Sequence, residues 1–213
     1  MSRWHAMVYE GAKRCFDILF SLLVLALVWP LLVAIAVAIK LDSPGSLIYQ
    51  GRRSGKGGRP FRIYKFRTMV PDAESFGTTT RIGDPRVTRV GRLLRQYKLD
   101  ELPQFFNVLR GEMSVVGPRP EVEEHTSAYS DAEKAILDVQ PGITDLASIR
   151  FVDLARELGT EDPHGEYLRR VRGEKNRLRL QYVQTRSFLV DMKIISLTAW
   201  TVLKKAVPAA WRR

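Results

Sequence analysis

Residues 18–39 read ILFSLLVLALVWPLLVAIAVAI and contain no charged side chain. The stretch exceeds the roughly 20 apolar residues that a helix needs to cross a bilayer. A secretory signal has a shorter apolar region followed by small residues at a cleavage site, whereas Lys40, Asp42, Pro44 and Gly45 follow here. We therefore expect the segment to be retained and to place the protein in a membrane.

Trp29 and Pro30 lie in the middle of this apolar segment. Proline removes a backbone donor and its ring clashes with the preceding turn, so a break or kink is expected there. Basic residues flank both ends, at Arg3, Lys13, Arg14, Lys40, Arg52, Arg53 and Lys56. These charges give no orientation for a span and suit a segment with both ends in the cytosol. Two interpretations stay open on these features, a re-entrant helix-break-helix and one kinked transmembrane helix.

The composition predicts one domain with a polyanionic partner. The 213 residues suffice for a single core. Lysine and arginine number 34 against 23 aspartates and glutamates, and the net charge of +11 favours nucleic acid, anionic lipid or a phosphorylated substrate. The single cysteine, Cys15, excludes an internal disulfide framework, so the sequence does not require an oxidising compartment.

After the apolar segment, the pattern predicts a β-hairpin and a helix. Residues 47–49 and 61–69 are strand-like and enclose a basic, glycine-rich loop at residues 51–60, whose spacing is not that of a P-loop. Asp84-Pro85 is a typical helix start and predicts a helix to about Tyr97. Its cationic face carries Arg86, Arg89, Arg92 and Arg95.

Further helices are expected in the second half of the chain. Residues 101–110 predict a helix capped by Asp100 and closed by Gly111. A charged helical stretch follows around residues 166–182. Residues 187–207 are rich in apolar side chains and include a tryptophan, a composition typical of a helix at the membrane interface.

Asp100 and Glu101 form a carboxylate pair at the start of the predicted helix. Arg95 and Lys98 precede the pair, and a Gly-Pro-Arg-Pro turn at residues 117–120 follows it. Local features leave two interpretations open. The pair is either a helix N-cap with a favourable dipole, which involves no chemistry, or a catalytic acidic pair.

Four short motifs occur in a fixed order along the chain. They are KFRTM at residues 65–69, LDELPQ at 99–104, FNVL at 106–109 and GEMSVVGPRP at 111–120. The chain resembles the bacterial sugar transferase family in these motifs, that is, the small monotopic polyprenyl-phosphate phosphoglycosyl transferases. The resemblance runs from Lys13-Arg14 to the Pro-Gly-Ile-Thr run at residues 141–144, and more loosely to the C-terminus.

The resemblance implies a transfer in two steps at one site. Asp100 would attack the sugar-bearing phosphorus of a UDP-sugar and expel UMP, and polyprenyl (undecaprenyl) phosphate would then take the phosphosugar from the aspartate. A magnesium ion (Mg2+) would neutralise the diphosphate, with Asp100 and Glu101 as its nearest protein ligands. Glu101 is thereby implied as the second catalytic residue.

The resemblance also implies which cations meet the phosphate charge. Lys65, Arg95 and Arg119 match the family's motif positions for this work. Pro118 and Pro120 would hold the backbone of Arg119 stiff, which suits bidentate contact with a phosphate or nucleotide. A salt bridge that braces the turn is the alternative role for Arg119.

The implied fold is α+β. A small cytosolic catalytic domain at residues 41–213 would follow an N-terminal membrane segment within residues 1–40, whose re-entrant helix-break-helix spans about residues 12–40 and breaks at Trp29 and Pro30. Interfacial amphipathic helices would complete the contact with lipid. Because the acceptor's charged head lies at the bilayer surface, the resemblance favours re-entry, with the site at the cytoplasmic face of the bacterial inner membrane. The expected partners are UDP-sugar, polyprenyl phosphate and membrane lipid.

Two departures from the family pattern stand out. Family members often have a small residue such as serine where this chain has Trp29, and many continue after residue 144 with Gly-Trp-Ala-Gln where this chain has Asp-Leu-Ala-Ser at 145–148. The hydrogen bonds at the break and the contacts to the sugar therefore do not carry over from the family. Neither the sugar, the glycan pathway nor the oligomeric state follows from the sequence.

The main rival function is a membrane-tethered binder of nucleic acid or anionic lipid, which the net charge would suit. The sequence lacks the regular alternation of aromatic and basic residues that stacks bases, and this reading leaves Asp100 and Glu101 without a role. We therefore expect no nucleic acid partner. A second rival keeps the same chemistry on a true single span.

Overall fold

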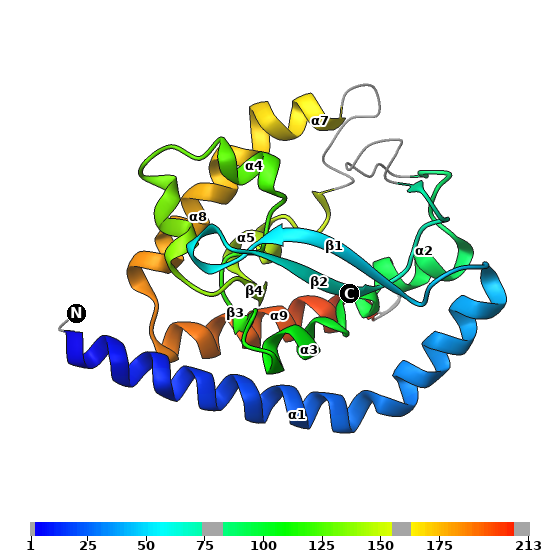
Figure 1. Ribbon diagram of the computed structural model, residues 1–213, viewed down its shortest axis with the longest axis horizontal. Helices are drawn as coiled ribbons and strands as arrows, with labels where there is room; N and C mark the ends of the chain where they lie inside the picture. The colour runs from blue at the N-terminus through cyan, green and yellow to red at the C-terminus, as the bar shows by residue number, and fades with distance from the viewer. Residues whose placement is uncertain (1–2, 74–82, 155–162, 207–213) are drawn as a thin grey trace.

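Figure 1 shows the computed structural model, which describes residues 3–73, 83–154 and 163–206. A helix of 40 residues, α1 (Arg3–Asp42), runs along one side of the molecule and curves around it. Two small sheets and the remaining helices form the rest of the described chain. The predicted combination of helices and sheets is confirmed.

Helix α1 continues through Pro30. An internal proline removes one helical hydrogen bond and bends a helix, while the bonds on either side persist. The predicted helix-break-helix at Trp29 and Pro30 is therefore wrong as an interruption, because the structure has one curved helix there. Within the described residues, Met7–Asp42 is the one helix long and apolar enough to cross a membrane.

The N-terminal half of α1 is fixed to the rest of the protein by polar contacts. Tyr9 Oη and Lys13 Nζ each donate to Asp191 Oδ2 at 2.8 Å, which ties α1 to α9 (Phe188–Ala206). Arg14 donates to the last carbonyls of α3 (Gln104–Leu109), at 2.6 and 2.9 Å. Asp17 accepts from the backbone N–H of Val115 at 3.0 Å. These contacts fix this half of the helix to α3, α9 and the segment at Val115.

The C-terminal half of α1 contacts the same body. Ile35 and Ile39 are buried in a cluster with Phe66 and Leu94, and Asp42 Oδ2 accepts from the N–H of Val90 at 3.0 Å. Asp42 thus satisfies one of the free N–H groups in the first turn of α2 (Arg89–Gln96). Both ends of the apolar helix therefore pack against one structural unit.

The predicted hairpin is confirmed, with a longer first strand. Strand β1 (Ile48–Ser54) pairs antiparallel with β2 (Pro60–Phe66), and the short helix η1 (Lys56–Gly58) joins them. Residues 51–54, expected in the loop, belong to β1 because they pair in register with residues 60–63. The basic loop is consequently shorter than predicted.

Helix α2 begins later than predicted. Its N-cap is Thr88, whose side chain accepts from the N–H of Gly91 at 2.9 Å. Asp84, the expected cap, instead accepts from the backbone and guanidinium of Arg86, and Val87 forms a β-bridge with Met69. The Asp-Pro signal therefore marks a turn, because the aspartate's nearest donors lie two residues ahead.

A second sheet consists of two short parallel strands, β3 (Ser114–Val116) and β4 (Gly142–Thr144). A Cβ atom on Gly142 would collide with the backbone of Gly117, so glycine is required for this close approach. The main core gathers around this sheet and α3. Its buried members are Ile63, Phe105, Val108, Met113, Val115, Val116, Tyr182 and Ile194.

Helices and turns complete the C-terminal part of the chain. They are α4 (Glu123–Ser127), η4 (Glu133–Asp138), α5 (Leu146–Arg150), α7 (Pro163–Glu166), η5 (Tyr167–Val171), α8 (Arg172–Thr185) and α9. The two helical stretches predicted near residues 166–182 and 187–207 are confirmed by α8 and α9, within the described residues. Leu189, Trp200 and Leu203 of α9 are exposed.

Candidate active site

The acidic pair lies in a single turn of 3-10 helix, η3 (Leu99–Glu101), between α2 and α3. Lys98 enters this turn in the left-handed conformation, with φ at 59°. Helix α3 begins only at Gln104, and its N-cap is Pro103. Asp100 is therefore not the cap of a helix at residues 101–110, because the chain turns once more before α3 starts.

Asp100 is buried, with 7 % of its surface exposed. Within the described chain its Oδ1 atom has no hydrogen-bond partner. Burial, followed by the negative charge of Glu101, raises the pKa of the Asp100 carboxyl, while Lys65, Lys98 and Arg95 act in the opposite direction. A buried carboxylate oxygen without a donor is costly for the fold and is expected where a ligand or chemistry uses it.

Glu101 has the opposite environment. Lys65 Nζ on β2 lies 3.1 Å from its Oε1, and Arg119 forms a two-pronged ion pair with both of its oxygens, of which Nη1 to Oε2 measures 3.0 Å. Burial alone would raise the pKa of Glu101, but the charges of Arg119 and Lys65 outweigh it and hold the pKa well below its usual range. Glu101 is therefore an ionised anchor for two cations.

Arg95 stands apart from the other two cations. Its Nε donates to Thr68 Oγ1 at 2.8 Å, so it is fixed to the end of the KFRTM motif rather than to Glu101. It still lies within electrostatic reach of Asp100. Lys65 and Arg119 thus meet on Glu101, whereas Arg95 approaches the pair from α2.

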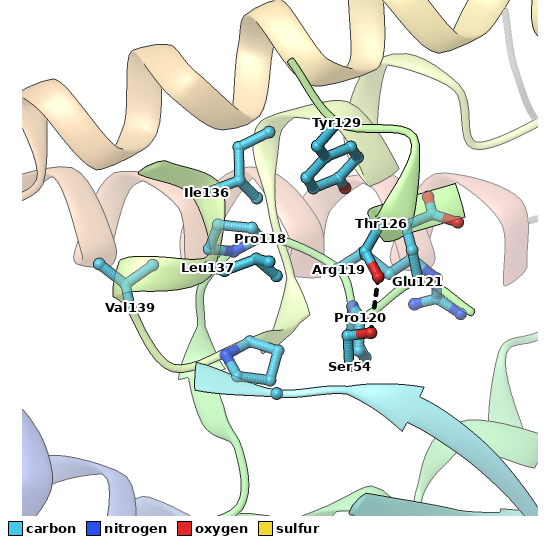
Figure 2. A pocket seen from close by; sticks show the side chains of 12 residues that line it. Ser54, Pro118, Arg119, Pro120, Glu121, Thr126, Tyr129, Ile136, Leu137 and Val139 are labelled. Carbon is cyan, nitrogen blue, oxygen red and sulfur yellow. Dashed lines mark hydrogen bonds between the residues drawn. The ribbon is translucent and has the colours of Figure 1, made fainter. Parts of the chain in front are cut away.

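Pro118 and Pro120 are both buried on either side of Arg119. Figure 2 shows them beside a small cavity that Ser54, Tyr129 and Val139 also line. Its volume of about 10 Å³ suffices for roughly one water molecule. The two prolines therefore shape the backbone around Arg119, and the cavity next to them is too small for a nucleotide.

The donor set suits a magnesium ion that arrives with a phosphorylated substrate. No group of three or more His, Cys, Asp or Glu side chains with metal-site geometry occurs in the described part of the chain. Mg²⁺ commonly binds one or two carboxylates together with substrate phosphates and waters. Asp100 Oδ1, which has no hydrogen-bond partner among the described residues, is available for such a contact, whereas both oxygens of Glu101 are held by cations.

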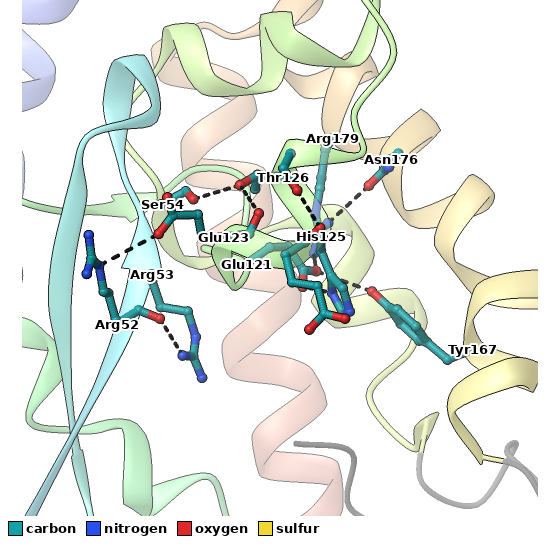
Figure 3. A network of polar contacts seen from close by, with 12 residues as sticks. Arg52, Arg53, Ser54, Glu121, Glu123, His125, Thr126, Tyr167, Asn176 and Arg179 are labelled. Carbon is teal, nitrogen blue, oxygen red and sulfur yellow. Dashed lines mark hydrogen bonds and ion pairs between the residues drawn. The ribbon is translucent and has the colours of Figure 1, made fainter. Parts of the chain in front are cut away.

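Sequence reasoning missed an ion network beside this site (Figure 3). Arg179 of α8 is 2 % exposed, and its Nη2 donates to Glu121 Oε1 at 2.5 Å. His125 Nδ1 lies 3.1 Å from Glu121 Oε2, and Tyr167 Oη donates to Oε1 at 3.3 Å. The available signals were weak: Glu121 directly follows the Pro-Arg-Pro run, and Arg179 falls three residues before the buried Tyr182.

The sequence model of the bacterial sugar transferases matches residues 8–205, and the chain belongs to this family. It is 52 % identical over 146 residues to the UDP-N-acetylgalactosamine-undecaprenyl-phosphate N-acetylgalactosaminephosphotransferase of Aeromonas hydrophila. This match covers 67 % of this chain and 34 % of the relative. It is 42 % identical over 196 residues to the UDP-glucose:undecaprenyl-phosphate glucose-1-phosphate transferase of Caulobacter vibrioides, with 90 % and 69 % covered.

A third relative, the UDP-glucose:undecaprenyl-phosphate glucose-1-phosphate transferase of Escherichia coli, is 40 % identical over 192 residues. The match covers 88 % of this chain and 39 % of that protein. The chain thus spans about a third to two thirds of the length of these three relatives.

Proposed function

We propose that this protein transfers a sugar-1-phosphate from a UDP-sugar to a polyprenyl phosphate, such as undecaprenyl phosphate, and releases UMP. The observation that carries the proposal is the buried Asp100, whose Oδ1 has no hydrogen-bond partner in the described chain, next to a glutamate that holds two cations. The names of the relatives, all UDP-sugar or undecaprenyl-phosphate transferases, support the same reaction class.

In the first step, a carboxylate oxygen of Asp100 attacks the sugar-bearing phosphorus, and the bond from this phosphorus to the UMP oxygen breaks. In the second step, an oxygen of the polyprenyl phosphate attacks the same phosphorus, and the bond to Asp100 breaks. Burial raises the pKa of Asp100, so its ionised form is a stronger base and nucleophile than an exposed carboxylate.

The cations serve the phosphoryl oxygens, on which negative charge gathers in both steps. Lys65 and Arg119 are already gathered at Glu101, one residue from the nucleophile. This supports orientation of the two cations as the role of Glu101. Magnesium would neutralise the diphosphate, with Asp100 Oδ1 and the substrate's oxygens as ligands, and Arg95 would add charge from α2.

The protein would sit in the cytoplasmic leaflet of the inner membrane, with α1 entering and leaving on the same side. Both halves of α1 contact one structural unit, through Lys13 and Asp17 at one end and Ile39 and Asp42 at the other. A spanning helix would separate its ends by the roughly 30 Å of the hydrocarbon core. Apolar side chains exposed along α1 and α9 would contact lipid, as interfacial helices do.

Release of UMP from a panel of UDP-sugars, with undecaprenyl phosphate as acceptor, tests the reaction. We expect release with at least one sugar and only in the presence of the intact acidic pair. No UMP from any UDP-sugar would contradict the proposed function and leave the cationic protein as a binder of anionic surfaces.

Cysteine labelling tests the topology, with Cys15 replaced and single cysteines introduced as His5→Cys and Ser46→Cys. Ser46 is exposed, whereas the adjacent Gly45 has φ at 114° and would not accept a side chain. We expect labelling of both sites from the cytosol. Periplasmic labelling of the His5→Cys site alone would establish a transmembrane span.

A further inference from the structure

Arg119 lies in a segment with few backbone donors. Pro118 and Pro120 have no N–H, so the N–H of Arg119 is the one donor in the Pro-Arg-Pro run. It donates to Asp145 Oδ2 at 2.9 Å. Asp145 is fully buried and stands directly after β4, at the N-cap of α5. The backbone of this arginine is therefore held by a side chain from another element.

The same carboxylate has two further partners. Asp145 Oδ1 accepts from the N–H of Ser148 at 2.6 Å, which caps α5, and Oδ2 lies 3.6 Å from Nε of the buried Arg179. Arg179 in turn donates to Glu121, the residue that follows Pro120. The Arg119 segment is thus bound on both sides of Pro120, at Arg119 and at Glu121, by one charged network, Asp145–Arg179–Glu121.

The guanidinium end of Arg119 is fixed as well. Its two terminal nitrogens contact Glu101, and Nη1 also approaches the carbonyl of Ile143 on β4, at 3.5 Å. Ile143 lies two residues before Asp145, so one short segment contacts both the backbone and the side chain of Arg119. A shift of this segment would move the arginine relative to the acidic pair.

We propose that Asp145 is a positioning residue for Arg119, and that the Asp145–Arg179–Glu121 network sets where this guanidinium stands relative to Asp100. The inference rests on the proposed function, in which Arg119 binds the phosphates of the UDP-sugar. Asp145 does not touch substrate in this role. It acts through the backbone of Arg119.

Two replacements separate positioning from helix capping. Asp145→Ser keeps an oxygen that caps α5 but is too short to replace the carboxylate at Arg119, and Asp145→Asn keeps the volume with one acceptor oxygen in place of two. Thr198→Val is the matched control, because Thr198 hydrogen-bonds Thr144, the neighbour of Asp145, at 2.7 Å and does not contact Arg119. Each change is made in the wild-type protein and in the Arg119→Ala variant.

The readouts are kcat and KM for the UDP-sugar, the affinity for UDP with magnesium, and the melting temperature. In the wild-type background we expect Asp145→Ser to weaken UDP binding and to lower kcat/KM by about tenfold, which corresponds to about 1.4 kcal/mol. Thr198→Val should stay within about twofold of wild type. In the Arg119→Ala background, Asp145→Ser should add no further loss, because the residue through which it acts is gone.

Three outcomes would overturn the inference. They are UDP affinity and kcat/KM unchanged in both Asp145 variants, an equal further loss in the Arg119→Ala background, and loss of the folded state in both variants, which would assign Asp145 to stability alone. Failure of the proposed function looks different, since wild type would then release no UMP while the UDP-binding comparison could still be made.

Discussion

The acidic pair and the Arg179 network both contain buried carboxylates and arginines, yet Asp100 and Glu121 differ in their hydrogen-bond partners and in the direction of their pKa shifts. Glu121 receives contacts from Arg179, His125 and Tyr167. Burial raises its pKa, but the charge of Arg179 and the hydrogen bonds from His125 and Arg179 outweigh burial and hold the pKa well below the usual range. Burial raises the pKa of Asp100, whose Oδ1 lacks a partner in the described chain.

The difference lies in where the cations stand. In the network, the guanidinium of Arg179 forms ion pairs with Glu121 and Asp145. These contacts connect α8 to the segments that contain the two carboxylates. In the acidic pair, Lys65 and Arg119 both form ion pairs with Glu101, and Asp100 Oδ1 has no hydrogen-bond partner in the described chain. Donors at both oxygens of Glu121 stabilise the fold, whereas a buried carboxylate oxygen without a donor in the described chain, as on Asp100, marks a place for chemistry.

The largest expected effect comes from removing the incompletely bonded carboxylate. Asp100→Asn should lower UMP release by about a thousandfold or more, because an amide cannot serve as the nucleophile. Glu101→Gln should impair turnover less, because the nucleophile stays in place while the anchor of two cations weakens. Steady-state UMP release measures both. Comparable turnover of Asp100→Asn and wild type would remove the difference between the two regions.

The cations of the acidic pair should come next. Arg119→Ala and Arg95→Ala should each lower kcat by about a hundredfold, the usual cost of one well-placed electrostatic group. Arg92→Ala is the matched control, because Arg92 is exposed on the same helix as Arg95. Near-normal turnover of both variants in a folded protein would leave the two arginines with a structural role.

The network should respond in stability. Arg179→Met leaves Glu121 and Asp145 buried without their cation, and we expect a loss of about 3 kcal/mol or more. For a chain of this length that lowers the melting temperature by about 6–12 °C. Arg177→Met, at an exposed position on the same helix, should change it little. An equal response of the two variants in thermal unfolding would show that the network does not brace the fold.

The smallest expected effect is a gain in the stability of the folded protein when Asp100 is replaced. The folded-state pKa of Asp100 is raised, so its ionised form destabilises the fold at neutral pH, and this penalty is lost as the pH falls through the raised pKa. Asp100→Asn should therefore stabilise the protein at pH 7 by about 1 kcal/mol and less near pH 4. Melting temperatures at both pH values measure it, with the exposed Asp131→Asn as control. A destabilised Asn variant at pH 7 would refute the sign.

Much of the fold could be predicted from local sequence patterns. The apolar run predicted the long helix, and two strand-like segments around a glycine-rich loop predicted the hairpin. A charged helical stretch predicted α8, and an apolar-rich stretch predicted α9. The helix starts predicted at Asp84 and Asp100 were wrong, because aspartate is common both at helix N-caps and in turns. Tertiary contacts determine which of the two roles such a residue has. These errors lie where the chain changes direction around the site.

The sequence could predict which residues form the candidate site but not how they are arranged. Motif order identified Lys65, Arg95, Arg119 and the acidic pair, but the partition of the cations between Glu101 and Thr68 depends on geometry. Arg179 and Asp145 lie outside the four motifs, and charged side chains are usually exposed to solvent, so neither residue was predicted to be buried. Their role follows from burial, which the sequence does not display.

Trapping the covalent intermediate tests the central claim most directly. Wild-type protein is mixed with magnesium and an active UDP-sugar without acceptor, and UMP release and the mass of the protein are followed together. We predict a burst of about one equivalent of UMP and a phosphosugar ester located on Asp100, both absent from Asp100→Asn. An adduct on another residue, or UMP that appears only once polyprenyl phosphate is added, would contradict the role assigned to Asp100.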